Sequence, residues 1–402
     1  MKAKILINIH YLEIGGAETS LIGLLHSLDP HYFNVDLLIN DSRGELMKHI
    51  PEWVNVVKIP EVYSMIERPI VEIIKKGYLK LAVSRFVAKY KYGKYVRKKQ
   101  PKTGDAIFGY VGKYVSKVLP SLKGLGEYDV AISFLTPHNI VADKITAKKK
   151  IAWIHTDYTK VDVNPEIELS IWTTFDKIIS ISPDVTASFL SVFPSLEDKI
   201  ILIENFLPQD LILKKAGDFL PKDMPKEKGV VNLLTIGRYC EAKRMDEIPL
   251  IAKVIQRSGI SCRWYIIGYG CPRELKKIKE AIEKHKVEDI VILLGKQKNP
   301  YPYIKACDIY VQPSRYEGKS ITVGEAQLLC KPVVITDYPT APSQVNNEID
   351  GFIGPYETEP FTNYLVKIIN DKELLSKVIN SLSTTAFSQQ ANLQKFLSVL
   401  NN

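Results

Sequence analysis

The segment from Pro313 to Ala326 combines two carboxylates with the start of a helix. Glu317 lies in an expected loop, and Gly-Lys-Ser-Ile-Thr at 318–322 follows it as a helix start. The first N–H groups of a helix lack partners within the helix and attract anions, so this turn could hold a diphosphate. Glu317 could accept hydrogen bonds from sugar hydroxyls, and Glu325, inside the helix, from a ribose diol. Two glutamates eight residues apart are also common in ordinary helices.

A second group of candidate residues is cationic. Arg238, Lys243 and Arg244 follow the apolar run 230–236, which we expect to be a strand. Ligands of α/β folds bind outside the carboxyl ends of parallel strands, where a guanidinium can fork onto phosphate oxygens and an ammonium adds a point charge. A basic surface turn is the alternative for this segment read alone.

Near the N-terminus, Gly15 and Gly16 stand between an expected strand at 4–9 and a helix start. Glycine there lets the backbone approach a ligand closely, and the helix terminus favours an anion. The segment lacks the G-x-G-x-x-G spacing, so it is not a nicotinamide-binding fingerprint. A purely structural turn is the alternative.

Several other chemistries find no support in the residue order. The chain has no Asp-x-Asp, no His, Cys or carboxylate cluster with metal-ligand spacing, and no Gly-x-Ser-x-Gly nucleophile elbow. Gly318-Lys-Ser is not a P-loop, because Pro313 occupies the position of the first glycine. The five cysteines never form Cys-x-x-Cys and are interpreted as reduced thiols. We therefore expect no metal or cofactor, with phosphate charge neutralised by side chains and helix dipoles.

The pattern of apolar runs predicts two α/β domains with mostly parallel sheets. A chain of 402 residues exceeds the usual size of one core. Expected strands are 4–9, 34–39, 54–59, 129–134, 150–154, 177–182 and 200–204 in the first half, and 230–236, 262–267, 290–294, 309–312, 333–336 and 352–353 in the second. The predicted divisions are an N-terminal domain at 1–207, a proline-containing linker at 208–229, a C-terminal domain at 230–375 and a helical tail at 376–402.

The net charge of +9 is concentrated in residues 75–123, the basic block, which carries fourteen Lys or Arg against one acid, Asp105. Membrane phospholipid, a lipid-linked diphosphate acceptor or nucleic acid would each satisfy it, and a solvated helical face is the alternative. Apolar and aromatic residues are interleaved with the charges, as in a helix that lies on a bilayer. No signal peptide or apolar run of membrane-spanning length is present. We expect a cytoplasmic protein attached peripherally to the inner face of the cell membrane.

With these residues assembled, the chain resembles the retaining glycosyltransferases of family 4. The resemblance covers essentially the whole chain and is carried by Ile236-Gly-Arg238 with Lys243, Ile267-Gly-Tyr-Gly270, Leu294-Gly295, Asp308-Ile-Tyr-Val-Gln-Pro-Ser314, and Glu317 with Glu325. Glu317-Gly-Lys-Ser-Ile-Thr and Trp153-Ile-His155-Thr-Asp157 are similar to bacterial surface-polysaccharide enzymes of capsule, exopolysaccharide or lipopolysaccharide assembly. The resemblance implies the GT-B fold: two Rossmann-like domains facing a central cleft, with the C-terminal helix packing back toward the N-terminal domain.

The resemblance also implies roles for individual residues. The donor diphosphate would be bound by Arg238, Lys243, Ser320, Ile321 and Thr322, the ribose by Glu325, and the base by backbone around Gly295 and Lys296. The catalytic candidates are Glu317 at the transferred sugar, His155 near its hydroxyls and Gly16 at the donor phosphate, and the acceptor side would include Gly15, His138 and Asp157. Many relatives have Gly-Phe-Gly after the first glutamate, where this chain has Gly318-Lys319-Ser320, so sugar identity does not carry over.

The reaction implied is transfer of a hexosyl group from a nucleoside diphosphate sugar, UDP favoured over GDP, to a hydroxyl of a lipid-linked saccharide. Configuration would be retained by a front-face mechanism, in which the leaving phosphate takes the acceptor's proton. Alternatives are an epimerase or phosphorylase-like enzyme of the same fold, or a non-catalytic nucleic-acid-binding protein. The last is disfavoured because the basic block lies outside the nucleotide-sugar motifs, so no nucleic acid partner is expected.

Overall fold

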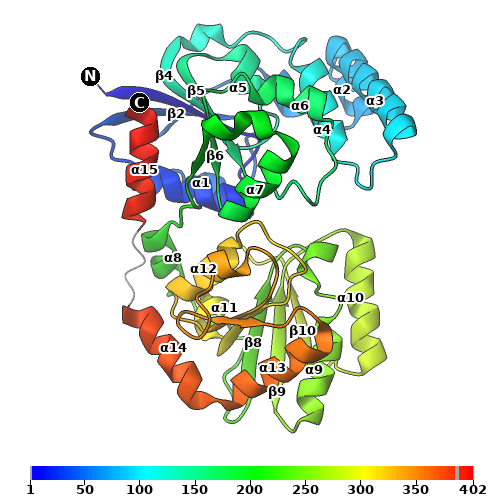
Figure 1. Cartoon of the computed structure of the whole chain (residues 1–402), viewed down its shortest axis with the longest axis vertical. Coiled ribbons are helices and arrows are strands. Elements are labelled where there is room, and N and C mark those ends of the chain that lie inside the picture. Colours follow the sequence, from blue (N-terminus) through cyan, green and yellow to red (C-terminus); the bar gives the residue numbers. More distant parts are fainter. Residues whose placement is uncertain (1, 385–388, 402) are drawn as a thin grey trace. The chain divides into compact units, whose positions relative to one another are not determined.

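The protein, in a computed structural model that describes residues 2–384 and 389–401, divides into two compact units. Unit 1 comprises Met1–Phe206 with Gln390–Asn402, and unit 2 comprises Leu207–Gln389. Each unit is built on one sheet covered by helices (Figure 1). Long β-branched runs explain this arrangement, because a parallel sheet is buried on both faces.

Unit 1 contains a parallel sheet of seven strands in the order β3-β2-β1-β4-β5-β6-β7. The strands are β1 (Ala3–Ile9), β2 (Phe33–Ile39), β3 (Asn55–Val56), β4 (Glu127–Ser133), β5 (Thr146–Ile154), β6 (Lys177–Ser180) and β7 (Ile200–Leu202). The helices are α1 (Gly16–Ser27), α2 (Ile70–Lys75), α3 (Leu79–Lys99), α4 (Ala106–Val115), α5 (Asn139–Lys144), α6 (Pro165–Trp172), α7 (Pro183–Val192) and α15 (Gln390–Asn401).

The last helix, α15, packs on unit 1. The Phe396 ring contacts the rings of Trp153 and Phe206, with centroids 5.9 and 6.3 Å away. Lys149 Nζ also donates a hydrogen bond of 2.6 Å to the Val399 carbonyl. The predicted return of the C-terminal helix to the N-terminal unit is therefore confirmed.

Unit 2 contains a parallel sheet of six strands in the order β10-β9-β8-β11-β12-β13. The strands are β8 (Val231–Ile236), β9 (Cys262–Ile267), β10 (Val291–Gly295), β11 (Ile309–Gln312), β12 (Val333–Thr336) and β13 (Phe352–Gly354). The helices are α8 (Gln209–Lys215), α9 (Ile248–Arg257), α10 (Pro272–His285), α11 (Tyr301–Ala306), α12 (Ile321–Leu328), α13 (Thr358–Asn370) and α14 (Lys372–Thr384).

Two apolar clusters cover the two faces of the unit 2 sheet. Leu233 of β8 lies in one cluster and its neighbour Leu234 in the other, as strand alternation requires. Segment 208–229, predicted as a linker, includes α8 and contributes Ile212, Ala216 and Met224 to the second cluster. Within the predicted tail, Val378 and Leu382 of α14 belong to the first.

Candidate functional site

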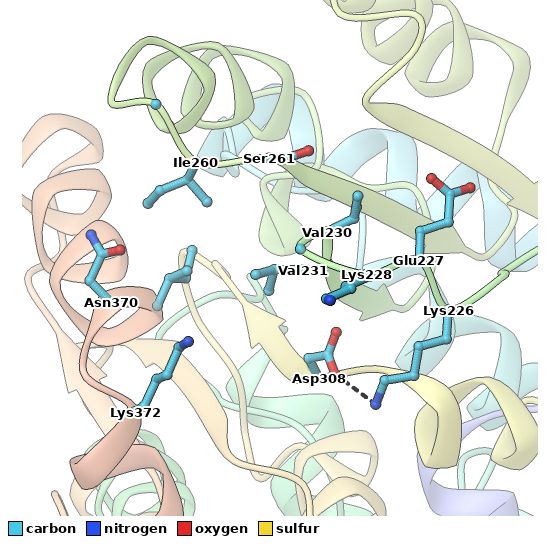
Figure 2. Close-up of a pocket in the computed structure, with 13 residues that line it drawn as sticks. Lys226, Glu227, Lys228, Val230, Val231, Ile260, Ser261, Asp308, Asn370 and Lys372 are labelled. Atoms are coloured by element: carbon cyan, nitrogen blue, oxygen red, sulfur yellow. Dashed lines mark ion pairs between the residues drawn. The ribbon is translucent and has the colours of Figure 1, made fainter.

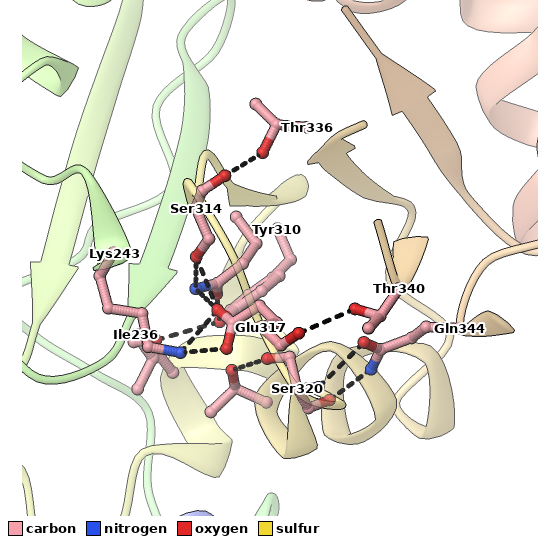
Figure 3. A network of polar contacts seen from close by, with 11 residues as sticks. Ile236, Lys243, Tyr310, Ser314, Glu317, Ser320, Thr336, Thr340 and Gln344 are labelled. Carbon is pink, nitrogen blue, oxygen red and sulfur yellow. Dashed lines mark hydrogen bonds and ion pairs between the residues drawn. The ribbon is translucent and has the colours of Figure 1, made fainter. Parts of the chain in front are cut away.

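The loops after β8 and β11 bring Lys243 and Glu317 together (Figure 3). Lys243 ends the short 3-10 helix η5 (Glu241–Lys243), and its Nζ donates to both Glu317 carboxylate oxygens, at 2.6 and 2.7 Å. Their side chains are 20% and 9% exposed, so water screens the pair less than it would a surface pair. The cation predicted to bind diphosphate thus contacts the carboxylate predicted to bind sugar.

Buried polar side chains fix the orientation of the Glu317 carboxylate. Its Oε1 accepts hydrogen bonds from Ser314 Oγ at 2.6 Å and Gln312 Nε2 at 3.1 Å. Gln312 Oε1 in turn accepts from the Tyr310 hydroxyl at 2.7 Å, and Thr340 Oγ1 donates to the Glu317 carbonyl at 3.0 Å. Gln312 and Ser314 are fully buried, so this chain of hydrogen bonds holds the Glu317 carboxylate in a fixed orientation. Sequence reasoning missed them as functional residues, although a buried glutamine ending an apolar strand is a usable signal.

The start of helix α12 is held next to this carboxylate. Ser320 N donates to Gln344 Oε1 at 2.9 Å, and the Gln344 amide donates back to the Ser320 carbonyl (Figure 3). The Ser320 side chain does not cap the helix, and its oxygen lies 3.1 Å from Thr322 Oγ1. The positive end of the α12 dipole therefore lies beside Lys243 and Glu317, a setting that suits phosphate oxygens.

Glu325 is buried one turn further along α12. It is 4% exposed, and its Oε1 accepts a hydrogen bond of 3.0 Å from the Tyr301 hydroxyl. Burial raises the pKa of the Glu325 carboxyl to about 8, and the Tyr301 hydrogen bond only partly opposes this. Glu325 is therefore mostly protonated at neutral pH in this structure.

The remaining predicted cations of unit 2 have different surroundings. Arg238 is exposed in the loop after β8. Arg244 is 6% exposed and is used structurally, because it pairs with Glu247 at 2.8 Å and donates to the Tyr356 carbonyl at 2.5 Å. These contacts engage the Arg244 guanidinium elsewhere than at the Lys243–Glu317 pair, and we assign Arg244 no part in the site.

The residues predicted to face the base lie at the end of β10, which β9 separates from β8 in the sheet. Gly295 has φ +65°, in the left-handed region that favours glycine, and its carbonyl accepts from Gly268 N at 2.9 Å. Lys296 is exposed, with Nζ 4.8 Å from the centre of the Tyr269 ring. Because all six strands are parallel, Lys296, Lys243 and Glu317 lie at the same, carboxyl edge of the sheet.

In unit 1, His138 and His155 follow the adjacent strands β4 and β5. His138 Nδ1 lies 2.8 Å from Ser133 Oγ, and its ring packs on Trp172 at 4.5 Å. The His155 ring packs on Phe134 at 4.9 Å, and its buried Nε2 has no partner among the described residues. Burial lowers the pKa of each imidazole to about 3, so both are neutral at physiological pH.

The other predicted residues of unit 1 serve local structure. At Gly15, the N-cap of α1, a Cβ atom would lie 2.2 Å from Glu18 Oε2, so a larger side chain would displace that buried glutamate. Gly16 begins α1 and is exposed. Asp157 Oδ1 accepts from the backbone N and the hydroxyl of Thr159, at 2.9 and 2.8 Å, and so orders its own turn.

A hollow of about 660 Å³ lies at the opposite, amino edge of the unit 2 sheet (Figure 2). Lys226, Ser261 and Asp308 line it, and Lys226 Nζ lies 3.6 Å from Asp308 Oδ1. Its lining contains none of the predicted site residues. Within the described part of the chain, no group of three or more His, Cys, Asp or Glu side chains is arranged to hold a metal ion.

Comparison with known proteins identifies the domain class that carries this geometry. Residues 218–382 match the family model of Glycosyl transferases group 1. The whole chain superposes on HepE from Anabaena in complex with UDP and glucose, with a TM-score of 0.70, 14% identity and full coverage of both chains. It also superposes on S. aureus TarM in a complex that includes UDP, with a TM-score of 0.66, 15% identity and full coverage. The fold is therefore GT-B, with a Glycosyl transferases group 1 domain in unit 2.

Several curated relatives are named as glycosyltransferases. An uncharacterized glycosyltransferase of Methanocaldococcus jannaschii is 30% identical over 46% of this chain and 48% of its own length. The amylovoran biosynthesis glycosyltransferase AmsD of Erwinia amylovora is 23% identical over 42% of this chain and 48% of its own. A Campylobacter jejuni transferase named for adding N-acetylgalactosamine to a diphospho-undecaprenol acceptor is 24% identical over 83% and 81%. The chain thus aligns with about half the length of the first two.

Proposed function

We propose that the protein transfers a hexosyl group from a nucleoside diphosphate sugar, UDP favoured over GDP, to a hydroxyl of a lipid-linked saccharide, with retention of configuration. One observation carries the proposal: Lys243, Glu317 and the start of α12 meet at the carboxyl edge of a parallel sheet. The group 1 family match over 218–382 and the UDP complexes of HepE and TarM support it. The retaining, family 4 chemistry is inferred from the sequence resemblance.

In this proposal Lys243 exchanges its partner during the reaction. Donor phosphate would take the Lys243 ammonium from Glu317, leaving the carboxylate to accept hydrogen bonds from the sugar. Arg238, the N–H groups of Ile321 and Thr322, and Ser320 through its hydroxyl would add to the stabilisation of the leaving diphosphate. Glu325 would bind the ribose, and Gly295 with Lys296 would face the base. The leaving phosphate would accept the acceptor's proton, so no enzymic nucleophile is needed.

Unit 1 would supply the acceptor side. Ser133 occupies His138 Nδ1, so a sugar hydroxyl would meet the other ring nitrogen of this neutral imidazole, and at His155 it would meet Nε2. Gly15, Gly16 and Asp157 belong to the same proposed region.

Among the described residues, no helix is long and apolar enough to cross a membrane. We propose instead that the basic block attaches the enzyme peripherally to the anionic inner face of the membrane during surface-polysaccharide assembly, as in capsule or lipopolysaccharide.

The purified protein, incubated with lipid-linked saccharides, should release UDP from a UDP-hexose and form a glycoside with the donor's anomeric configuration. Turnover should be the same with and without EDTA, because side chains and a helix terminus would neutralise the phosphates. Coupled UDP detection and NMR of the product check this. If the protein released no nucleoside diphosphate from any nucleotide sugar, the proposed function would be wrong. A product of inverted configuration would contradict retention. Loss of turnover in EDTA that Mg²⁺ or Mn²⁺ restores would contradict metal independence.

A further inference from the structure

Helix α3 of unit 1 has one apolar face packed on the protein and another in solvent. On the packed side, Ala88 clusters with Tyr110 of α4 and Ile167 of α6, and Ser84 Oγ donates to the Tyr114 carbonyl at 2.6 Å. Leu81 and Ala82 are also buried. Packing within unit 1 therefore explains the apolar residues on this side of α3.

The solvent side carries four large apolar side chains, which we call the α3 ridge. Leu79, Val83, Phe86 and Tyr90 are 61%, 63%, 66% and 55% exposed. Their spacing of four, three and four residues places them on one stripe of the helix. In the neighbouring helix α2, Val71 and Ile74 are 64% and 49% exposed. A contiguous row of exposed apolar residues of this size marks an interaction surface.

Cations surround this ridge, and α3 itself carries no acid. Residues 79–99 carry eight Lys or Arg and no Asp or Glu. Arg85 points inward and donates to the Arg68 carbonyl at 3.1 Å, while the other seven are exposed, and within the described residues none of these seven pairs with a carboxylate. They are Lys80, Lys89, Lys91, Lys94, Arg97, Lys98 and Lys99. In Figure 1, α2 and α3 lie at the edge of unit 1 away from its chain termini.

We propose that the α3 ridge inserts into the interfacial layer of an anionic bilayer, with the flanking Lys and Arg at the lipid headgroups. Apolar residues can enter the boundary between headgroups and acyl chains while long cationic side chains extend to the phosphates. A second copy of the chain would bring two sets of seven cations together, and like charges oppose that contact. Nucleic acid would use the cations but gain little from Leu79 and Val83, which cannot stack on bases.

This inference rests on the proposed function and deepens its membrane partner, because it assigns the contact to particular side chains. The sequence alone does not distinguish which apolar residues between 73 and 114 pack on the protein and which face solvent. The structure divides them: Ile73, Leu81 and Tyr110 are buried, whereas the α3 ridge is exposed. Attachment should therefore depend on four identifiable side chains as well as on the charge of the block.

The test compares two double variants that each remove two exposed apolar side chains from the full-length protein. Val83→Ser/Phe86→Ser changes the ridge, whereas Tyr32→Ser/Leu220→Ser changes side chains elsewhere that are 69% and 88% exposed. Co-sedimentation with phosphatidylcholine vesicles, with and without phosphatidylglycerol, gives the partition coefficient. The parent and the control should bind the anionic vesicles equally, and the ridge variant about tenfold or more weakly, because binding scales with inserted apolar area.

A third variant, Lys91→Gln/Lys94→Gln/Arg97→Gln, should also bind the anionic vesicles more weakly. UDP binding and melting temperature, measured on every variant, separate loss of the membrane surface from misfolding and from failure of the proposed function. Equal vesicle binding by the parent and the ridge variant, or no binding by the parent, would overturn the inference. The inference would also be overturned if the parent formed a dimer, or bound single-stranded DNA, and the ridge variant did not.

Discussion

Glu317→Gln is expected to lower kcat by about 100-fold or more while changing the Kd for UDP only a few fold. Ser314 and Gln312 hold the parent carboxylate, and their hydrogen bonds would remain after Lys243 moves to the donor phosphate, so the carboxylate can act on the transition state without reorientation. Glutamine keeps the size of the side chain but lacks the negative charge, which would stabilise the positive charge that develops on the sugar in the transition state. It also releases Lys243, which remains available for phosphate.

Steady-state kinetics and a UDP titration of the same preparation separate the two effects. The matched control is Glu227→Gln, which removes a carboxylate paired with Arg263 at 2.5 Å at the amino edge of the same sheet. The control should behave as the parent does. Weaker UDP binding with kcat unchanged would instead assign Glu317 to nucleotide binding, and our role for it would be wrong.

Glu325→Gln is expected to stabilise the protein increasingly as pH rises from about 4.5 to about 8. Below this window the carboxyl is protonated in both the folded and unfolded states, so it has no pH-dependent effect. Within the window the unfolded chain ionises while buried Glu325 keeps its proton, so the free energy of unfolding of the parent falls with pH. Above it the full cost remains, on the order of 3–5 kcal/mol. Glutamine removes that cost and can still accept from Tyr301.

Urea unfolding of parent and variant across this pH range measures the difference. Glu227→Gln serves again as the control, because it makes the same substitution at an exposed position. A stability difference that does not change between pH 4.5 and 8 would contradict a buried, protonated Glu325. Glu325→Ala, which removes both side-chain oxygens, should bind UDP about tenfold or more weakly, because the proposed hydrogen bonds from the ribose hydroxyls are lost.

Strand positions could be predicted from the sequence because buried parallel strands are continuous apolar runs. The expected 262–267, 309–312 and 333–336 coincide with β9, β11 and β12. The predicted 54–59 contains only the two-residue β3. In segment 208–229, α8 is only 7 residues long and contributes Ile212 to the core, so the helix is too short to show an apolar repeat in the sequence.

The site could be predicted only in part. Chain order places Lys243 and Glu317 after strands of one sheet, but their direct contact depends on strand order, in which β8 and β11 are neighbours. The supporting Gln344 comes from beyond β12, too far along the chain for any local pattern. Arg244 looks like Lys243 in sequence, and only the positions of Glu247 and the Tyr356 carbonyl distinguish its structural role.

Titrating the purified protein with UDP by calorimetry tests the central claim that the carboxyl edge of the unit 2 sheet is a nucleotide-sugar site. The parent should bind one UDP, and Lys243→Ala should bind about ten- to a hundredfold more weakly, because a charge-assisted phosphate contact is lost. Lys226→Ala removes the same charge from the opposite edge, where Lys226 faces Asp308, and should bind UDP as the parent does. No UDP binding by the parent, or equal binding by the parent and Lys243→Ala, would contradict the account.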